Sequence, residues 1–227
     1  ALGANCQFLS LVGEDENANI LREKMDKENI HFHLISDNSR STTFKKRYLV
    51  ENQKLFRVTR LEQSEINLEV EDKIIKELES AARTANGIVI SDFVYGVITN
   101  KVLCKVHELA KKYNLYLFGD LQCSSQVGSI MKFTKFSLLC PNEKEARIAL
   151  HEKDLDLEAL SLKIIKKTNS DKLIMKLGSD GFIAYEHANG KIINQAFPAL
   201  SVNPIDVAGA GDSLLAIMAV GIASSQK

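Results

Sequence analysis

Short apolar runs alternate with amphipathic stretches along most of the chain, and this alternation limits the possible folds more than any other feature. From residue 67 onward, apolar runs predict strands at residues 87–90, 115–118, 136–140 and 172–177. Stretches with helical periodicity predict helices at residues 68–85, 99–113, 143–150 and 155–167. Strands that alternate with helices form a parallel sheet flanked by helices. We therefore expect an α/β fold with a doubly wound, mostly parallel sheet.

The N-terminal part begins with the same alternation and then departs from it. Residues 7–12 predict a strand and residues 14–28 a helix, whereas residues 31–35, 42–50 and 55–59 read as three strands in succession. We expect residues 31–60 to form a small antiparallel β block. Near the other end, Asn189 and Gly190 predict a hairpin turn at the edge of the sheet, between strands at residues 182–185 and 192–197.

Composition and charge restrict the size of the fold and the class of partner. The chain has 227 residues, 45% of them hydrophobic, which is enough for one globular domain with a sizeable core. Its formal net charge is +0, so no overall field attracts nucleic acid or an anionic membrane. We expect the partners to be small molecules, without nucleic acid or membrane.

The cysteines and the apolar stretches indicate a cytoplasmic protein. Cys6, Cys104, Cys123 and Cys140 lie far apart and form no Cys-x-x-Cys pair, which is typical of reduced cysteines and not of disulfides or a zinc site. No apolar stretch is long enough to span a membrane, and the first residues lack the pattern of a signal peptide. The cytoplasm is the expected location.

Polar residues and a glycine stand at the ends of successive predicted strands. Asp92, Asp120, Asn142 and Gly178 each end or follow one of them. Ligands of open α/β sheets bind at the carboxyl edge of the strands, so these residues predict a site there. Each Asp or Asn could instead cap the helix that follows it.

Residues 206–213 (Asp-Val-Ala-Gly-Ala-Gly-Asp-Ser) carry the most specific functional signal. Gly209 and Gly211 precede an apolar helix, and glycine backbone amides at a helix start form a receptor for a phosphoryl group. Asp212 would repel that anion, so its presence favours a role as proton acceptor for an attacking hydroxyl. The alternative is a glycine turn whose Asp caps a core helix.

These residues resemble the C-terminal signature of the ribokinase-like (PfkB-type) carbohydrate kinases. The resemblance implies a ribokinase-like fold and an ATP-dependent sugar kinase, in which the amides of Gly209, Ala210 and Gly211 form the anion hole and Asp212 is the catalytic base. It places Asp206 among the cofactor-binding residues. It implies ATP and Mg²⁺ as cofactors, with a monovalent cation as a further candidate.

Two further segments extend the resemblance. Asn142 and Glu145 are similar to the family's Asn-x-x-Glu motif, which organises magnesium and phosphate, often through water; a capping box is the alternative. Residues 176–181 resemble the family's Thr-x-Gly-x-x-Gly nucleotide loop, with Lys176 in place of Thr and with Gly178 and Gly181 retained. A plain turn between two strands is the alternative there.

The β block resembles the lid and sugar-binding segment of the heptose-phosphate kinases, on residues 41–47 and 51–57. The resemblance implies that Lys45, Arg47 and Asn52, with Asp92, bind a phosphorylated sugar, and that the lids of two copies pair into a dimer. Strand alternation puts Lys45 and Arg47 on one face. The block gathers an excess of cations, namely Arg40, Lys45, Lys46, Arg47, Lys54, Arg57 and Arg60. A solvated strand face is the alternative.

The chain departs from the heptose-phosphate kinases at two positions near the phosphates. Tyr95 stands where they have Lys, and Leu121-Gln122 stands where they have Pro-Lys. These losses leave open the sugar and the way its charge is neutralised. A non-catalytic sugar-binding relative and a nucleoside kinase of the same fold are the alternative functions. Against the family pattern we expect one kinase domain that is truncated at both ends.

Overall fold

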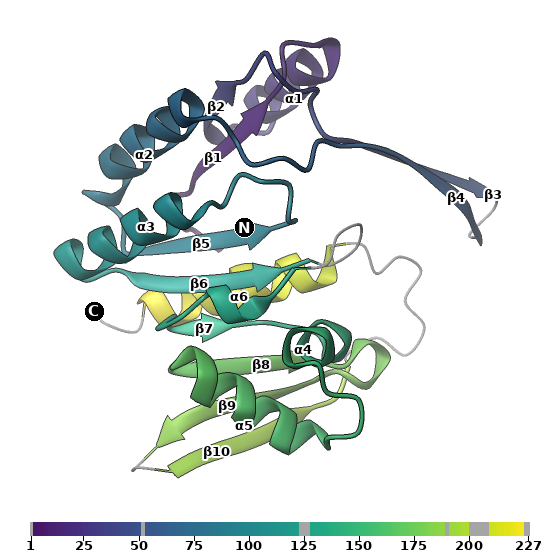
Figure 1. Ribbon diagram of the computed structural model, residues 1–227, viewed down its shortest axis with the longest axis vertical. Helices are drawn as coiled ribbons and strands as arrows, with labels where there is room; N and C mark the ends of the chain where they lie inside the picture. The colour runs from purple at the N-terminus through teal and green to yellow at the C-terminus, as the bar shows by residue number, and fades with distance from the viewer. Residues whose placement is uncertain (1, 51–52, 123–127, 189–190, 200–208, 225–227) are drawn as a thin grey trace. The chain divides into compact units, whose positions relative to one another are not determined.

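The computed structural model describes residues 2–50, 53–122, 128–188, 191–199 and 209–224. The chain divides into two compact units, each described by itself below. The first unit comprises residues 1–85 and 95–113, and the second comprises residues 86–94 and 114–227. Figure 1 shows the elements of both.

The first unit contains a parallel two-stranded sheet and three helices. Strand β1 (Gln7–Val12) pairs with β2 (His31–Ser36), and the helices are α1 (Glu16–Lys27), α2 (Leu68–Ala82) and α3 (Asn100–Tyr113). Asp15 starts α1 by accepting a hydrogen bond from the Ala18 amide, as an N-cap aspartate does. An apolar core joins the sheet to α2 and α3 through Ile66, Val70, Ile74 and Val102, with Leu9, Leu11 and Ile35 packed against them.

The prediction that residues 31–35 belong to an antiparallel block is wrong, because β2 runs parallel to β1. Helix α1 connects the two strands as a crossover and returns the chain to the same direction. The antiparallel part is the hairpin of β3 (Phe44–Val50) and β4 (Gln53–Arg60), where the prediction is confirmed. Its register shifts between Tyr48 and Leu49. This hairpin extends away from β1, β2 and α2 (Figure 1).

The second unit contains a six-stranded sheet with the order β10-β9-β8-β7-β6-β5. Its strands are β5 (Gly87–Asp92), β6 (Tyr116–Leu121), β7 (Leu138–Leu139), β8 (Lys172–Lys176), β9 (Phe182–Ala188) and β10 (Lys191–Phe197). Strands β5 to β8 are parallel, whereas β9 and β10 form the predicted antiparallel hairpin at the edge. The prediction of a mostly parallel sheet is confirmed.

Helices cover both faces of this sheet, as a doubly wound fold requires. The helices are α4 (Glu143–Leu150), α5 (Leu157–Thr168) and α6 (Ala210–Ser224), with 3₁₀ turns η1 (Ile130–Lys132) and η2 (Gly178–Asp180). Helix α6 lies on one face, and α4 and α5 lie on the other (Figure 1). Leu215 and Ala219 of α6 pack on Phe118, Cys140 and Ile174 of the sheet region.

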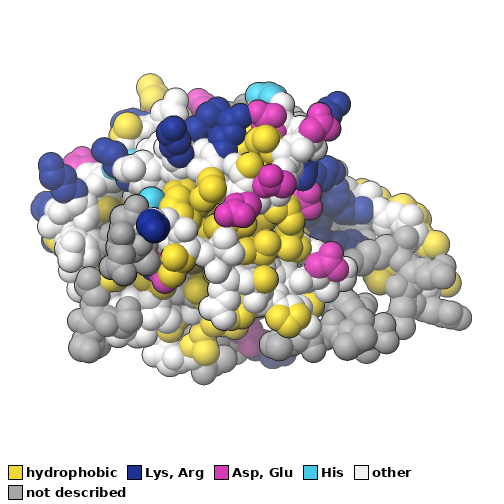
Figure 2. Space-filling model, turned by 90° about the horizontal axis from the view of Figure 1, so that it is seen from below, with side chains coloured by type: hydrophobic (Ala, Val, Ile, Leu, Met, Phe, Trp, Pro, Cys, Tyr) yellow, Lys and Arg dark blue, Asp and Glu magenta, His cyan; other side chains and the backbone are white. Residues whose placement is uncertain are grey.

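The described surface carries charges of both signs. Lys and Arg side chains and Asp and Glu side chains share the face seen in Figure 2, which agrees with the net charge of +0. Within the described ranges, every helix is too short or too polar to cross a bilayer.

Candidate functional site

The start of α6 provides a place for an anion. Gly209 has a φ of 81°, a left-handed conformation that favours glycine, and its carbonyl accepts a hydrogen bond from the Ser213 amide at 2.8 Å. Gly209 and Ala210 are exposed and Gly211 is half-buried. The amides of a first helical turn lack partners within the helix and lie at the positive end of its dipole. This end of α6 can therefore receive a phosphoryl group.

Asp212 lies in this first turn and is exposed. The side-chain amide of Gln122, directly after β6, donates to Asp212 Oδ1 at 2.7 Å. The contact orients the carboxylate through a neutral amide. An exposed, oriented carboxylate beside an anion receptor can accept a proton from a hydroxyl that attacks phosphorus.

A buried ion pair lies beside Asp212. Lys176 Nζ donates to both carboxylate oxygens of Asp120, at 2.9 and 2.8 Å, and the Asp120 side chain is fully buried. Burial raises the pKa of Asp120, and the negative charge of Asp212 raises it too, although the Lys176 ammonium opposes both. A Cβ atom on Gly211 would lie 3.2 Å from Lys176 Nζ, so the ammonium also lies against the start of α6.

Asp92 occupies the same edge of the sheet. It ends β5 and pairs in register with Leu121, the residue after Asp120. Its side chain is buried, accepts a hydrogen bond from the Val94 amide at 2.8 Å and forms an ion pair with Lys132 of η1. The sheet therefore brings together the strand-end residues Asp92 and Asp120, as the sequence predicts.

Asn142 and Glu145 form a reciprocal capping box at the start of α4. The Glu145 amide donates to Asn142 Oδ1 at 2.8 Å, and the Asn142 amide donates to Glu145 Oε2 at 2.9 Å. The capping interpretation is confirmed. Amide and carboxylate oxygens suit Mg²⁺ and have more than one lone pair, so a role at a hydrated magnesium ion stays a prediction. Among the described residues, no group of three His, Cys, Asp or Glu side chains could hold a metal directly.

Gly178 and Gly181 shape the turn between β8 and β9. Both have positive φ angles, 65° and 91°. A Cβ atom on Gly181 would lie 2.0 Å from the Phe197 carbonyl oxygen, so the backbone requires glycine there. The turn interpretation is confirmed, whereas a nucleotide contact stays a prediction. Asp206 and Asn52 lie outside the described residues.

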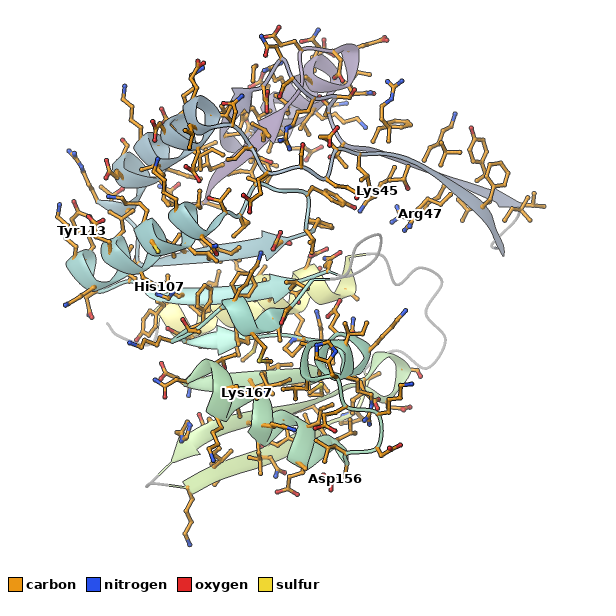
Figure 3. The ribbon with its side chains drawn as sticks, viewed as in Figure 1. Lys45, Arg47, His107, Tyr113, Asp156 and Lys167 are labelled. Carbon is orange, nitrogen blue, oxygen red and sulfur yellow. The ribbon has the colours of Figure 1, made fainter. Side chains whose placement is uncertain are left out.

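The cations of the hairpin belong to the first unit. Lys45 and Arg47 project from the same side of β3 (Figure 3), which confirms the predicted alternation. Lys45 Nζ lies over the Tyr95 ring, 5.1 Å from its centroid. Arg57 of β4 pairs in register with Arg47. Cationic side chains form charge-assisted hydrogen bonds with anions, so this face suits an anionic ligand.

Sequence reasoning missed three contacts of these sites. The motifs of the sequence assign no role to Gln122, yet its side-chain amide donates to Asp212. Lys132 belongs to none of the motifs, although it forms an ion pair with Asp92. The position of Arg57 opposite Arg47 follows from the hairpin register, which the sequence of a bulged hairpin does not define.

Comparison with known proteins places these features in a family. A family model described as "pfkB family carbohydrate kinase" matches residues 1–227. The bifunctional protein HldE of Campylobacter jejuni subsp. jejuni serotype O:2 is 32% identical over 232 residues, which cover 99% of this chain and 46% of that protein. The chain thus spans about half the length of the curated relatives that it matches.

Two solved structures show the fold. Phosphofructokinase-2 from Escherichia coli, in complex with substrates and products, matches with a TM-score of 0.77 and 14% identity, over 100% of this chain and 72% of that one. Ribokinase from Giardia lamblia matches with a TM-score of 0.72 and 15% identity, over 92% of this chain and 64% of that one. The prediction of a ribokinase-like fold is confirmed.

Proposed function

The chain belongs to the pfkB family of carbohydrate kinases, and we propose that it transfers the γ-phosphoryl group of ATP to a hydroxyl of a phosphorylated sugar. The observation that carries this proposal is the position of Asp212, oriented by Gln122 in the first turn of α6 beside Gly209 and Gly211. A proton acceptor and an anion receptor thus lie at the same helix start.

The chemistry follows from this arrangement. The sugar hydroxyl oxygen bonds to the γ-phosphorus while the bond from phosphorus to the bridging oxygen of ADP breaks. Asp212 takes the hydroxyl proton, and ADP leaves with the electron pair of the broken bond. The amides of Gly209, Ala210 and Gly211 donate to the oxygens of the group in transfer, where negative charge is concentrated.

Asn142 and Glu145 are the proposed magnesium residues, acting through water. A bound Mg²⁺ ion would neutralise phosphate charge. Lys176, Gly178, Gly181 and Asp206 are proposed to contact the nucleotide, on family resemblance. A monovalent cation is a further proposed cofactor, since one solved structure of E. coli phosphofructokinase-2 is a complex with potassium.

The proposed substrate carries a phosphate that binds Lys45 and Arg47 of the hairpin. Arg57 lies opposite Arg47, so an anion there would accept charge-assisted hydrogen bonds from both guanidinium groups. Asp92 and Asn52 are proposed to bind sugar hydroxyls. The resemblance of this hairpin to heptose-phosphate kinases favours a heptose 7-phosphate.

The apolar side of the hairpin supports pairing of two copies. Tyr48 and Phe56 stack with their ring centroids 4.4 Å apart, and both are exposed. Phe44 and Val58 lie on the same side and are exposed as well, and the hairpin exposes further apolar side chains at Leu49, Val50 and Leu55. A two-stranded hairpin is marginal by itself, and a second hairpin would cover this surface. We propose a homodimer through β3 and β4.

We also propose that both units of the chain work as one kinase domain, and that the protein acts in the cytoplasm.

Asp212→Asn should lower kcat by about 100-fold or more while ATP binding changes little, because the variant loses the proton acceptor and keeps the helix start. The measurement is steady-state kinetics of ATP-dependent phosphorylation, with ATP affinity from calorimetry. The matched control is Asp171→Asn, which changes an exposed aspartate directly before β8, at the end of the strand opposite Lys176. A kcat near the wild-type value would contradict the role of Asp212. Absence of turnover in the wild type would favour a non-catalytic sugar-binding protein.

Glu145→Gln should raise the magnesium concentration needed for half-maximal activity, because the amide can still cap α4 but attracts the hydrated cation less. Magnesium titrations of the variant and of Glu143→Gln, which alters a half-buried carboxylate in the same turn, provide the comparison. If the two titrations coincide with the wild type, Glu145 serves only the helix cap.

Arg47→Ala should raise the KM for a sugar phosphate by roughly 10- to 100-fold, because one charge-assisted contact is lost. The KM for ATP should stay nearly constant. Lys46→Ala changes a cation on the opposite face of the same strand and should have little effect on either KM. Preference for an unphosphorylated sugar, with a KM unaffected by Arg47→Ala, would leave the cations of this face without a substrate role.

Phe56→Glu should convert the proposed dimer to a monomer, because it places a charge in the surface that the second hairpin would cover. Sedimentation equilibrium measures the mass, and Leu68→Glu, at an exposed apolar residue of α2, is the control. A wild-type chain that is monomeric at micromolar concentration would disprove the dimer.

A further inference from the structure

Lys176 is held from several sides at the end of β8. Its backbone amide donates to the Pro141 carbonyl at 2.9 Å, and its strand continues as a parallel bridge to Asn142. Its ammonium donates to Asp120 at 2.8 and 2.9 Å, and only 16% of its side chain is exposed. The ammonium therefore has a defined position.

That position adjoins the start of α6. A Cβ atom on Gly211 would approach Lys176 Nζ to 3.2 Å, and the last two carbons of the lysine side chain would also lie within 4 Å. The absent side chain of Gly211 thus gives Lys176 access to the helix start. An ammonium group has three N–H donors, and the two oxygens of Asp120 account for two of them.

The local balance of charge calls for a cation there. Asp120 and Asp212 are both carboxylates, and they lie close enough for the charge of Asp212 to raise the pKa of Asp120, whose burial raises it more. Gln122 adds a neutral amide. Two carboxylates beside an anion receptor would repel a phosphoryl group unless a positive charge offsets them.

We infer that Lys176 supplies the positive charge for the transferred phosphoryl group, in place of the lysines that the heptose-phosphate kinases have at the positions of Tyr95 and Gln122. This inference rests on the proposed kinase function. Lys176 donates to a non-bridging oxygen of the γ-phosphoryl group and keeps all its protons during transfer, while Asp212 takes the hydroxyl proton. Asp120 is a positioning residue, because it holds the ammonium against Gly211.

The test separates a phosphate contact from a purely structural ion pair. Lys176→Met alone would leave the buried Asp120 carboxylate with the Leu121 amide but without a counter-charge, and could unfold the chain. The double variant Lys176→Met/Asp120→Asn removes both charges and keeps the shapes. Lys172→Met/Glu186→Gln removes an ion pair from the other end of β8 and is the matched control. Urea unfolding and circular dichroism establish that each variant is folded.

Calorimetry then compares the binding of ATP with that of adenosine, which lacks phosphates. The Lys176/Asp120 double variant should bind ATP about 10- to 100-fold more weakly than the wild type does. Its affinity for adenosine should stay within about twofold of the wild-type affinity. The control variant should match the wild type with both ligands. Equal ATP affinity in the double variant and the wild type would overturn the inference, as would an equal loss for ATP and adenosine.

The same samples distinguish a failure of the inference from a failure of the proposed function. A wild-type chain that binds ATP but phosphorylates neither sugars nor sugar phosphates overturns the kinase proposal, while the ATP and adenosine comparison still decides the contact of Lys176. A wild-type chain that binds no ATP overturns both.

Discussion

The apolar contact between α6 and the sheet determines where the proposed catalytic group lies. Leu215 and Ala219 pack on Phe118, Leu138 and Ile174, and full burial of one leucine side chain contributes about 1.5–3 kcal/mol. Asp212 lies one turn before Leu215 on this helix, so the packing fixes the distance from its carboxylate to the end of β6. The hydrogen bond from Gln122 is possible only because the helix is anchored in this way.

The charge balance at the carboxyl edge of the sheet depends on ion pairs between residues that are far apart in the sequence. Asp92 and Asp120 are both buried, and an unpaired buried carboxylate is costly. Each is neutralised by a lysine from a later element, Asp92 by Lys132 and Asp120 by Lys176. The chain therefore places cations at this edge from η1 and β8.

Local patterns predicted those parts of the structure that depend on local chemistry. Alternation of apolar residues located the strands of the second unit, and period-two alternation placed Lys45 and Arg47 on one face. The motif at Asn142 supported two interpretations, and its hydrogen bonds show that the cap is formed, whereas the magnesium role depends on a ligand.

Local sequence patterns do not predict contacts between distant parts of the chain. The pairing of β2 with β1 was not predicted, because a strand's own sequence does not specify which partner it pairs with, or in which direction. The contact between Gln122 and Asp212 joins residues 90 positions apart and depends on the packing of α6. The pairing of Arg47 with Arg57 depends on the shift in register at Tyr48 and Leu49.

Cys140 lies in the apolar cluster that α6 covers. Burial raises the pKa of its thiol to about 12, so almost none of it is the reactive thiolate at neutral pH. Alkylation of this thiol therefore has to wait until α6 lifts from the sheet, a local opening that would also move Asp212 away from Gln122. The rate at which Cys140 is alkylated therefore reports the frequency of this local opening, in which the helix that carries Asp212 detaches from the sheet.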